Sequence, residues 1–156
     1  MIRRPPRSTL DRSSAASDVY KRQMEGCIAR SAKHLAGTQF QHLDSALSDL
    51  PTIRNYVARM RCQADMARTL WLDTITAMET GREDVMLRVL QSKAVAGETA
   101  LEVLATGMRV CGGAAYRKDV GVERYFRDAQ ASSVMAPTVD VLYDFIGKAV
   151  CGMDLF

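Results

Sequence analysis

The sequence predicts an all-α protein, an up-and-down bundle of about four to five helices. Apolar residues recur at intervals of three and four over most of its 156 residues, which is the period of an amphipathic helix. The composition, 47% hydrophobic but only 6% aromatic, favours helices over sheets. Glycine and proline interrupt the period at a few well-separated points, which predicts short connections between antiparallel neighbours.

Length and hydropathy limit the class of protein further. A chain of 156 residues can form one domain with a sizeable core. No apolar run approaches the roughly 18 to 20 residues of a membrane span, and no apolar segment follows the first basic residues as in a signal peptide. We therefore expect a soluble, cytoplasmic protein without a membrane partner.

Residues 1–23 differ from the rest of the chain. They hold six basic and two acidic residues, whereas residues 24–156 hold 15 basic and 16 acidic ones, so the excess of positive charge belongs to this leader. Pro, Ser and Arg without an apolar period predict disorder. A nucleic-acid arm or a targeting peptide is one interpretation. The segment also resembles a translated sequencing-library adapter, which favours a non-native leader before a domain of residues 24–156, with no nucleic-acid partner.

The first predicted helix covers residues 24–37 and ends at Gly37, and residues 38–50 form a polar crossing loop. Ser48 or Asp49 can cap the next helix, with Pro51 in its first turn. That helix continues for about seven turns, because its apolar stripe consists of Ile53, Val57, Met60, Ala64, Ala67, Trp71, Ile75 and Met78.

A third helix is predicted from about Glu83 to Cys111. Its inward side is rich in small residues, which let another helix approach closely; we expect this side to become an interface between subunits. Glu98 and Glu102 lie four apart on one face. They could form a carboxylate pair for acid and base chemistry, although a solvated face is the simpler interpretation.

Two glycines then end the third helix. Gly112 and Gly113 suit a left-handed helix stop, and Asp119 can cap a fourth helix. The segment Met135-Ala136-Pro137 breaks that helix, and a last helix covers about residues 138–150, ending at Gly152. Within it, Asp144 and Lys148 form a favourable pair four residues apart.

The sequence offers no recognisable metal site. Cys27, Cys62, Cys111 and Cys151 are scattered without a C-x-x-C pair, which predicts buried free thiols. His34 and His42 stand at the edge of a helix, and neither belongs to an E-x-x-H pair, which argues against a di-iron bundle.

The double glycine and the segment after it carry a more specific signal. Gly112-Gly113, a loop aromatic at Tyr116, and V-E-R-x-x-R-D-A at Val122 to Ala129 resemble the C-terminal helical domain of the acyl-CoA dehydrogenase family of flavoenzymes. The resemblance runs from about Met24 to the C-terminus. It implies a fragment of a larger FAD-dependent oxidoreductase, in which a carboxylate removes the α-proton of an acyl-CoA while a hydride passes to the flavin.

The resemblance also assigns positions, with one departure that matters for chemistry. Ala136 occupies the place of the glutamate that serves many relatives as the base, so no catalytic residue is identified; some relatives carry that glutamate upstream of Met24 instead. The implied FAD contacts are Phe40, Arg109, Gly112, Gly113, Thr138 and Asp140, some of them with the FAD of a neighbouring subunit. Gly37 and Pro51 replace the arginine and glutamine common near Phe40.

These contacts have simpler interpretations. Arg109 also suits the C-terminal end of a helix dipole, and Thr138 and Asp140 suit a helix cap and first turn. Arg124 and Arg127 with Glu123 and Asp128 are expected to form structural ion pairs.

We expect an inactive fragment whose parent forms a homodimer or homotetramer and uses an acyl-CoA and an electron acceptor. The alternatives are a stand-alone helical-bundle interaction or scaffold protein and a relative that acts as a flavin-dependent oxidase or monooxygenase.

Overall fold

The computed structural model describes residues 7–40 and 44–154, and helices dominate both stretches. His42 lies outside the described residues. The elements in chain order are α1 (Arg7–Gly37), β1 (Gln39–Phe40), β2 (Ser45–Ala46), the 3-10 helix η1 (Leu47–Asp49), α2 (Pro51–Thr80), α3 (Val85–Cys111), the 3-10 helix η2 (Gly112–Tyr116), α4 (Val122–Ala129), α5 (Ala131–Val134) and α6 (Val139–Val150).

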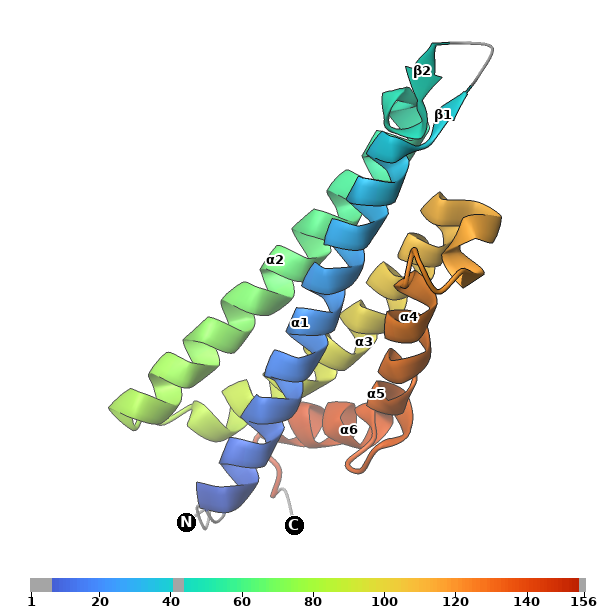
Figure 1. Ribbon diagram of the computed structural model, residues 1–156. Coiled ribbons are helices and arrows are strands. Elements are labelled where there is room, and N and C mark those ends of the chain that lie inside the picture. The colour runs from blue at the N-terminus through green and yellow to red at the C-terminus, as the bar shows by residue number, and fades with distance from the viewer. Residues whose placement is uncertain (1–6, 41–43, 155–156) are drawn as a thin grey trace.

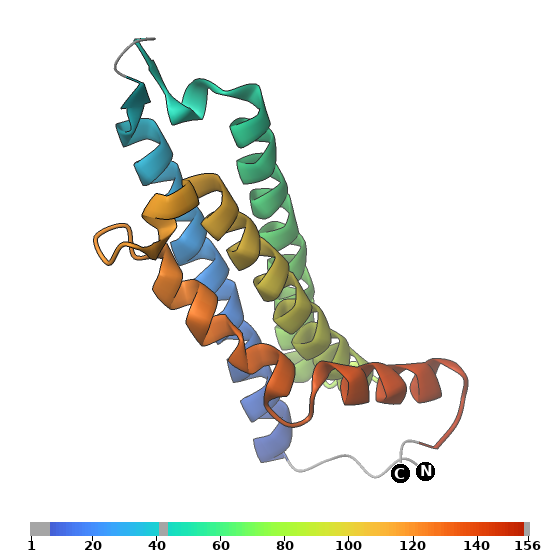
Figure 2. The ribbon, with the colours of Figure 1, turned by 90° about the vertical axis from the view of Figure 1, so that its right-hand side faces the viewer.

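The long helices α1, α2 and α3 lie side by side and alternate in direction (Figure 1). α4 and α5 run back along α3, and α6 then lies crosswise at the end of the bundle where α1 begins (Figure 2). The predicted crossing loop holds a small antiparallel ladder, with Gln39 opposite Ala46 and Phe40 opposite Ser45. The predicted all-α bundle is confirmed.

α3 forms the centre of the core, because it packs against α1, α2, α4 and α6. Its small residues Ala96, Gly97, Ala100 and Gly107 are buried inside this chain. At Gly107 the side chains of α1 pack so closely that an added Cβ would overlap the Cys27 sulfur. The prediction that this side of the third helix is an interface between copies is therefore wrong for these residues, since the chain's own helices cover them.

The predicted disorder of the leader is wrong for residues 7–23, which form the first turns of α1, whereas residues 1–6 lie outside the described part. Ser14, Ser17 and Tyr20 are buried there, and they continue the stripe of Met24 and Cys27 at helical spacing. Two of these inward residues are serines, which count as polar in a search for apolar periodicity. The backbone carbonyl of Ser14 accepts a hydrogen bond of 3.2 Å from the Trp71 indole on α2, which joins the two helices.

Most of the predicted helix boundaries are confirmed. Pro51 occupies the first turn of α2, and Gly81 ends it in the left-handed region with φ 66°. Two predicted caps are wrong: Leu50 precedes α2 without any side-chain cap, and Gly121 rather than Asp119 precedes α4. The Asp119 carboxylate instead accepts hydrogen bonds from Arg117, which lies two residues away and competes with the backbone for it.

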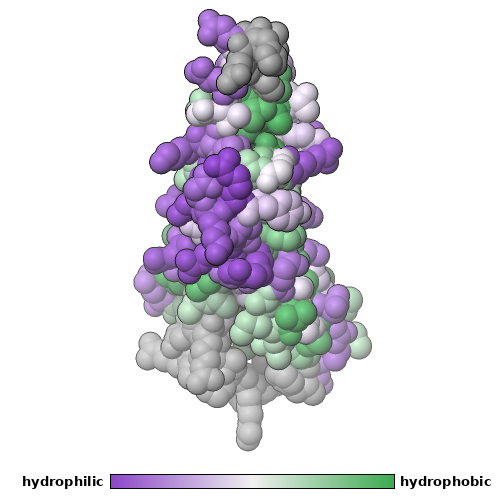
Figure 3. All heavy atoms as spheres, turned by 45° about the vertical axis from the view of Figure 1, so that its right-hand side comes forward, coloured by the Kyte–Doolittle hydropathy of each residue, from purple (hydrophilic) through white to green (hydrophobic). Residues whose placement is uncertain are grey.

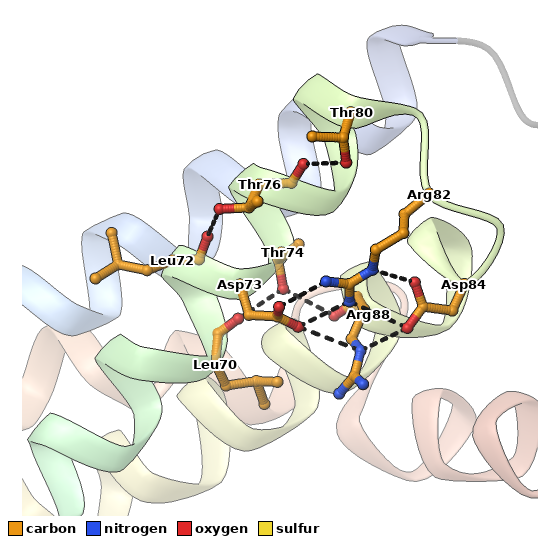
Figure 4. Close-up of polar contacts among 9 residues, drawn as sticks. All are labelled: Leu70, Leu72, Asp73, Thr74, Thr76, Thr80, Arg82, Asp84 and Arg88. Atoms are coloured by element: carbon orange, nitrogen blue, oxygen red, sulfur yellow. Dashed lines mark hydrogen bonds and ion pairs between the residues drawn. The ribbon is translucent and has the colours of Figure 1, made fainter.

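An ion-pair network, not anticipated from the sequence, fastens the turn between α2 and α3 (Figure 4). The Arg82 guanidinium donates to Asp73 on α2 at 2.7 Å and to Asp84 at 2.7 Å, and Arg88 on α3 donates to Asp84 at 2.8 Å. The Thr74 hydroxyl lies 3.2 Å from the carbonyl oxygen of Arg88 and 2.8 Å from that of Leu70. These contacts fix the geometry with which α3 enters the core.

Candidate functional site

The first group of predicted site residues lies at the C-terminal end of α3. Gly112 has φ 58° and ψ −143°, so the predicted positive φ is confirmed, although the conformation is not that of a left-handed helix cap. Gly112 and Gly113 are exposed, and no atom lies within 4 Å of a Cβ built on either. Another molecule can therefore approach this backbone closely.

Arg109 lies beside this corner with its side chain exposed. Its guanidinium stands 4.9 Å from the centre of the Tyr56 ring on α2, a cation–π contact that orients the charge. Among the described residues no carboxylate forms a salt bridge with Arg109, so its hydrogen-bond donors are free for an anion. Its place in the last turn of α3 equally fits the simpler interpretation through the helix dipole.

The second group lies in the turn between α5 and α6. Thr138 is the N-cap residue of α6 in an extended conformation, and its carbonyl accepts the Leu142 amide at 3.0 Å. Its hydroxyl forms no cap hydrogen bond, and the side chain is only half buried. Asp140 follows in the first turn of α6 and is exposed, as is Ala136. The structure thus leaves the predicted positions of this turn open to contact from outside.

Lys93 on α3 is a residue of this region whose role the sequence did not reveal. It is buried, with 8% of its surface exposed, and its Nζ donates a hydrogen bond of 3.3 Å to the Ala136 carbonyl oxygen. Burial lowers the pKa of its ammonium group, because desolvation disfavours the charged form. The sequence offered one signal, a charged residue on the inward side of the third helix. It could not reveal the partner of Lys93, because Ala136 lies 43 residues further along the chain.

The two groups are separate. A Cβ built on Gly97 would lie 3.5 Å from both Ser132 and Val139, which flank the α5–α6 turn. Gly97 precedes Arg109 by twelve residues, or about 18 Å along a helix axis. The structure therefore does not bring Arg109, Gly112 and Gly113 together with Thr138 and Asp140. For Phe40, only the backbone belongs to the described part, in β1.

The two glutamates considered for acid and base chemistry bind different helices. The Tyr143 hydroxyl on α6 donates to Glu98 at 2.5 Å, which raises the pKa of Tyr143 to about 12. Glu102 accepts a hydrogen bond of 2.7 Å from the Gln63 amide on α2. Both side chains are exposed. This arrangement agrees with the simpler interpretation of a solvated face rather than a paired carboxylate site.

The charged motif on α4 forms local ion pairs, as predicted for its arginines. Arg124 and Arg127 lie 3.6 and 3.2 Å from the Asp128 carboxylate. Glu123 differs from the prediction, because its Oε2 is buried without a hydrogen-bond partner among the described residues. Figure 3 shows hydrophilic side chains gathered across the middle of this face and hydrophobic ones toward the end where α6 lies. Exposed apolar residues of that end include Val141, Tyr143 and Val150.

The cysteines fall into two classes. Cys27 and Cys111 are buried, and burial raises the pKa of Cys27 to about 11, so that it stays a thiol. Cys62 and Cys151 are exposed, so the prediction of buried thiols is wrong for these two. Within residues 7–40 and 44–154 no three potential ligands gather into a metal site. The same residues include no helix with the length and apolarity needed to cross a bilayer.

A protein-family profile matches most of this chain. The profile described as "Acyl-CoA dehydrogenase, C-terminal domain" matches residues 19–151, which is most of the chain. The chain belongs to the acyl-CoA dehydrogenase family as its C-terminal domain. The match begins inside the segment of residues 1–23, so the family pattern starts before Met24.

Individual relatives of the acyl-CoA dehydrogenase family agree with this assignment. The cyclohex-1-ene-1-carbonyl-CoA dehydrogenase of Geobacter metallireducens is 27% identical over 104 residues, which are 67% of this chain and 27% of that protein. The mitochondrial very long-chain specific acyl-CoA dehydrogenase of Bos taurus is 27% identical over 129 residues, 82% of this chain and 19% of that protein. The chain thus spans about a fifth to a quarter of the length of these relatives.

Solved structures share the fold. The butyryl-CoA dehydrogenase of Megasphaera elsdenii matches with a TM-score of 0.83 and 21% identity, over 89% of this chain and 36% of that one. A glutaryl-coenzyme A dehydrogenase in complex with glutaryl-CoA matches with a TM-score of 0.83 and 20% identity, over 92% and 36% of the two chains. PigA, solved with FAD and proline, has a TM-score of 0.84 at 16% identity, over 92% and 37%.

Proposed function

We propose that this domain forms part of an FAD-dependent oxidoreductase that dehydrogenates the α,β bond of an acyl-CoA thioester. The observation that carries the proposal is the match of the acyl-CoA dehydrogenase C-terminal profile over residues 19–151. The chain alone is inactive under this proposal, because it spans only a fraction of its relatives and carries no identified base. The parent acts as a homodimer or homotetramer in the cytoplasm and passes electrons to an acceptor.

The residues present suit a dinucleotide. Arg109, oriented by Tyr56 and without a carboxylate partner among the described residues, supplies a cation for a phosphate. The open backbone at Gly112 and Gly113 allows a ligand to approach without a side chain in the way. Such contacts bind the cofactor of a neighbouring copy, together with Phe40 from the β1 segment.

The turn between α5 and α6 serves the reacting end. Thr138 has an uncommitted hydroxyl that donates to or accepts from a flavin edge, and Asp140 orients polar groups beside it. The flavin, when bound, accepts the hydride; the residues of this chain position it and exclude water. Separation of the two groups by about 18 Å along α3 fits contacts with different parts of an extended cofactor, or with two copies of it.

The departure from the family lies at Ala136, which has no group that accepts a proton. Glu98 does not replace it, because its carboxylate is exposed and already accepts the Tyr143 hydroxyl. The base for proton removal therefore comes from a part of the parent protein outside these residues, or the parent carries out different flavin chemistry.

A chimera tests the proposal directly. Residues 19–156, starting where the family match starts, replace the corresponding C-terminal part of the Geobacter metallireducens relative, and the purified chimera is examined for flavin absorbance and for dehydrogenation of its acyl-CoA. We expect bound FAD with little activity, and a gain of activity in the Ala136→Glu variant. The control is the matched chimera with Arg109→Glu, which we expect to hold less FAD. A folded, oligomeric chimera that binds no FAD would refute the proposal.

Ala136 also favours a second candidate, a flavin-dependent oxidase or monooxygenase, since such chemistry does not need a carboxylate at this position. In that case the chimera holds FAD, and Ala136→Glu brings no dehydrogenase activity. The third candidate is a stand-alone helical scaffold. In that case we expect FAD to change neither the melting temperature nor the absorbance of any of these proteins.

A further inference from the structure

Lys93 is a buried ammonium group, and apart from Ser92 the buried residues around it on α3 are apolar. Its neighbours on α3 include the buried residues Val89, Ala96 and Gly97, and 8% of Lys93 is exposed. Its hydrogen bond to the Ala136 carbonyl, 3.3 Å long, is the only polar contact that the described residues offer it. We propose that Lys93 is a positioning residue, which fixes the backbone of the α5–α6 turn and thereby the placement of Thr138.

The contacts around the turn support this role. One helical turn after Lys93, the Gly97 carbonyl accepts a hydrogen bond of 3.1 Å from the buried Ser132 hydroxyl, so α3 also holds the α5 side of the turn. The missing side chain at Gly97 leaves room for Ser132 and Val139, each 3.5 Å from a Cβ built there. α3 thus contacts the chain before the turn at Ser132, within the turn at Ala136 and after it at Val139.

The side chains of the turn point the other way. Val134 is 73% exposed and Met135 59% exposed, and Ala136 is exposed as well. The turn is therefore fastened through its backbone from inside, while its outer surface stays free for contact. Without the bond from Lys93, the Ala136 carbonyl has no partner from α3.

The desolvation cost of a buried ammonium group indicates what a lysine contributes at this position. A buried ammonium without a carboxylate partner is unfavourable, and an apolar side chain of similar length would fill the same space at less cost in desolvation. What the lysine adds is a donor that reaches across to α5 and α6. It therefore improves the definition of the turn rather than the global stability of the bundle. That the ordered turn serves a flavin rests on the function proposed above.

Amide hydrogen exchange of the 156-residue chain tests the positioning role. We expect Lys93→Met to accelerate exchange of the Met135 and Leu142 amides, which donate hydrogen bonds to the Ala131 and Thr138 carbonyls, about tenfold or more, as for loss of a hydrogen bond to a charged group. Exchange in α2 should stay unchanged, and the melting temperature should stay the same or rise, since the buried charge is gone. Lys93→Arg keeps a donor and should restore slow exchange. Lys148→Met, which removes an ion pair on α6 itself, is the matched control.

Two results would overturn the inference. Either Lys93→Met leaves exchange of the Met135 and Leu142 amides as in the wild type, or it lowers the melting temperature and accelerates exchange throughout the bundle, which indicates a general structural role. In the chimera described above, Lys93→Met should alter the flavin absorption spectrum, and Lys93→Arg should preserve it. A chimera that never holds FAD refutes the proposed function, while the exchange experiment still decides the role of Lys93.

Discussion

Single residues decide how closely the helices approach. Gly107 on α3 faces Cys27 and Ser31 on α1, and all three are buried. There is no room for a methyl group at this point, because interiors of proteins are packed as densely as organic crystals. This contact sets the spacing between α1 and the central helix at this point.

We therefore expect Gly107→Ala to lower the free energy of unfolding by about 1 to 3 kcal/mol, the range for overpacking a core. Urea denaturation measures this. The control is Gly147→Ala on α6, where no atom lies within 4 Å of a built Cβ, and where alanine should be neutral or stabilising. The Cys27→Ala change should relieve part of the loss in a double variant. Equal stability of Gly107→Ala and wild type would show that α1 can move away freely.

Polar networks join the helices, and some of the residues in one network lie far apart in the sequence. The connection of α2 to α3 depends on Arg82, which binds Asp73 nine residues earlier and Asp84 two residues later. Hydrogen bonds from Arg82 and Arg88 lower the pKa of Asp84 from 3.8 to about 2. The carboxylate is thus held in its charged form by the folded turn.

The pKa of Asp84 is lower in the folded state than in the unfolded state. Its charged carboxylate therefore stabilises the fold at pH values above the unfolded-state pKa, and this stabilisation is lost as the pH falls through the folded-state pKa. We expect Asp84→Asn to lower the melting temperature at neutral pH. The difference from the wild type should shrink as the pH falls from about 4 to about 2, the interval between the two pKa values. Thermal scans across this range measure the effect. Glu83→Gln, at an exposed neighbour, is the control; a difference that persists at low pH would contradict the assignment.

At the scale of the whole molecule, the bundle uses more of the chain than the sequence indicated. The segment before Met24 supplies Ser14, Ser17 and Tyr20 to the core. Trp71 donates to Ser14, and the Lys21 ammonium lies 4.9 Å from the Trp71 ring centre. The helical leader thus packs on α2. That residues 1–23 are a non-native leader of adapter origin stays a prediction.

Deletion of residues 1–23 tests what the leader contributes. We expect a lower melting temperature, with a loss on the order of 2 kcal/mol or more from exposure of Tyr20 and its neighbours. The emission of Trp71, the single tryptophan, should shift to the red. Trp71→Phe in the full chain identifies the signal. Unchanged stability and emission would mean that the leader does not pack in solution, and a loss of nucleic-acid binding would revive the interpretation as a basic arm.

The sequence by itself determined the helices that follow Met24 and the family. Helical periodicity and breaks at Gly81, Gly112 and Pro137 are local properties, and the V-E-R-x-x-R-D-A motif on α4 lies within one short stretch. Only the tertiary structure decided which polar residues are buried and what they bind: Ser17 in the leader, Asp119 paired with Arg117, and Lys93 reaching Ala136. Hydrophobic patterning records which face of a helix turns inward, because that face repeats every 3.6 residues. The partner of a buried donor depends instead on how distant segments pack, and no period in the sequence records it.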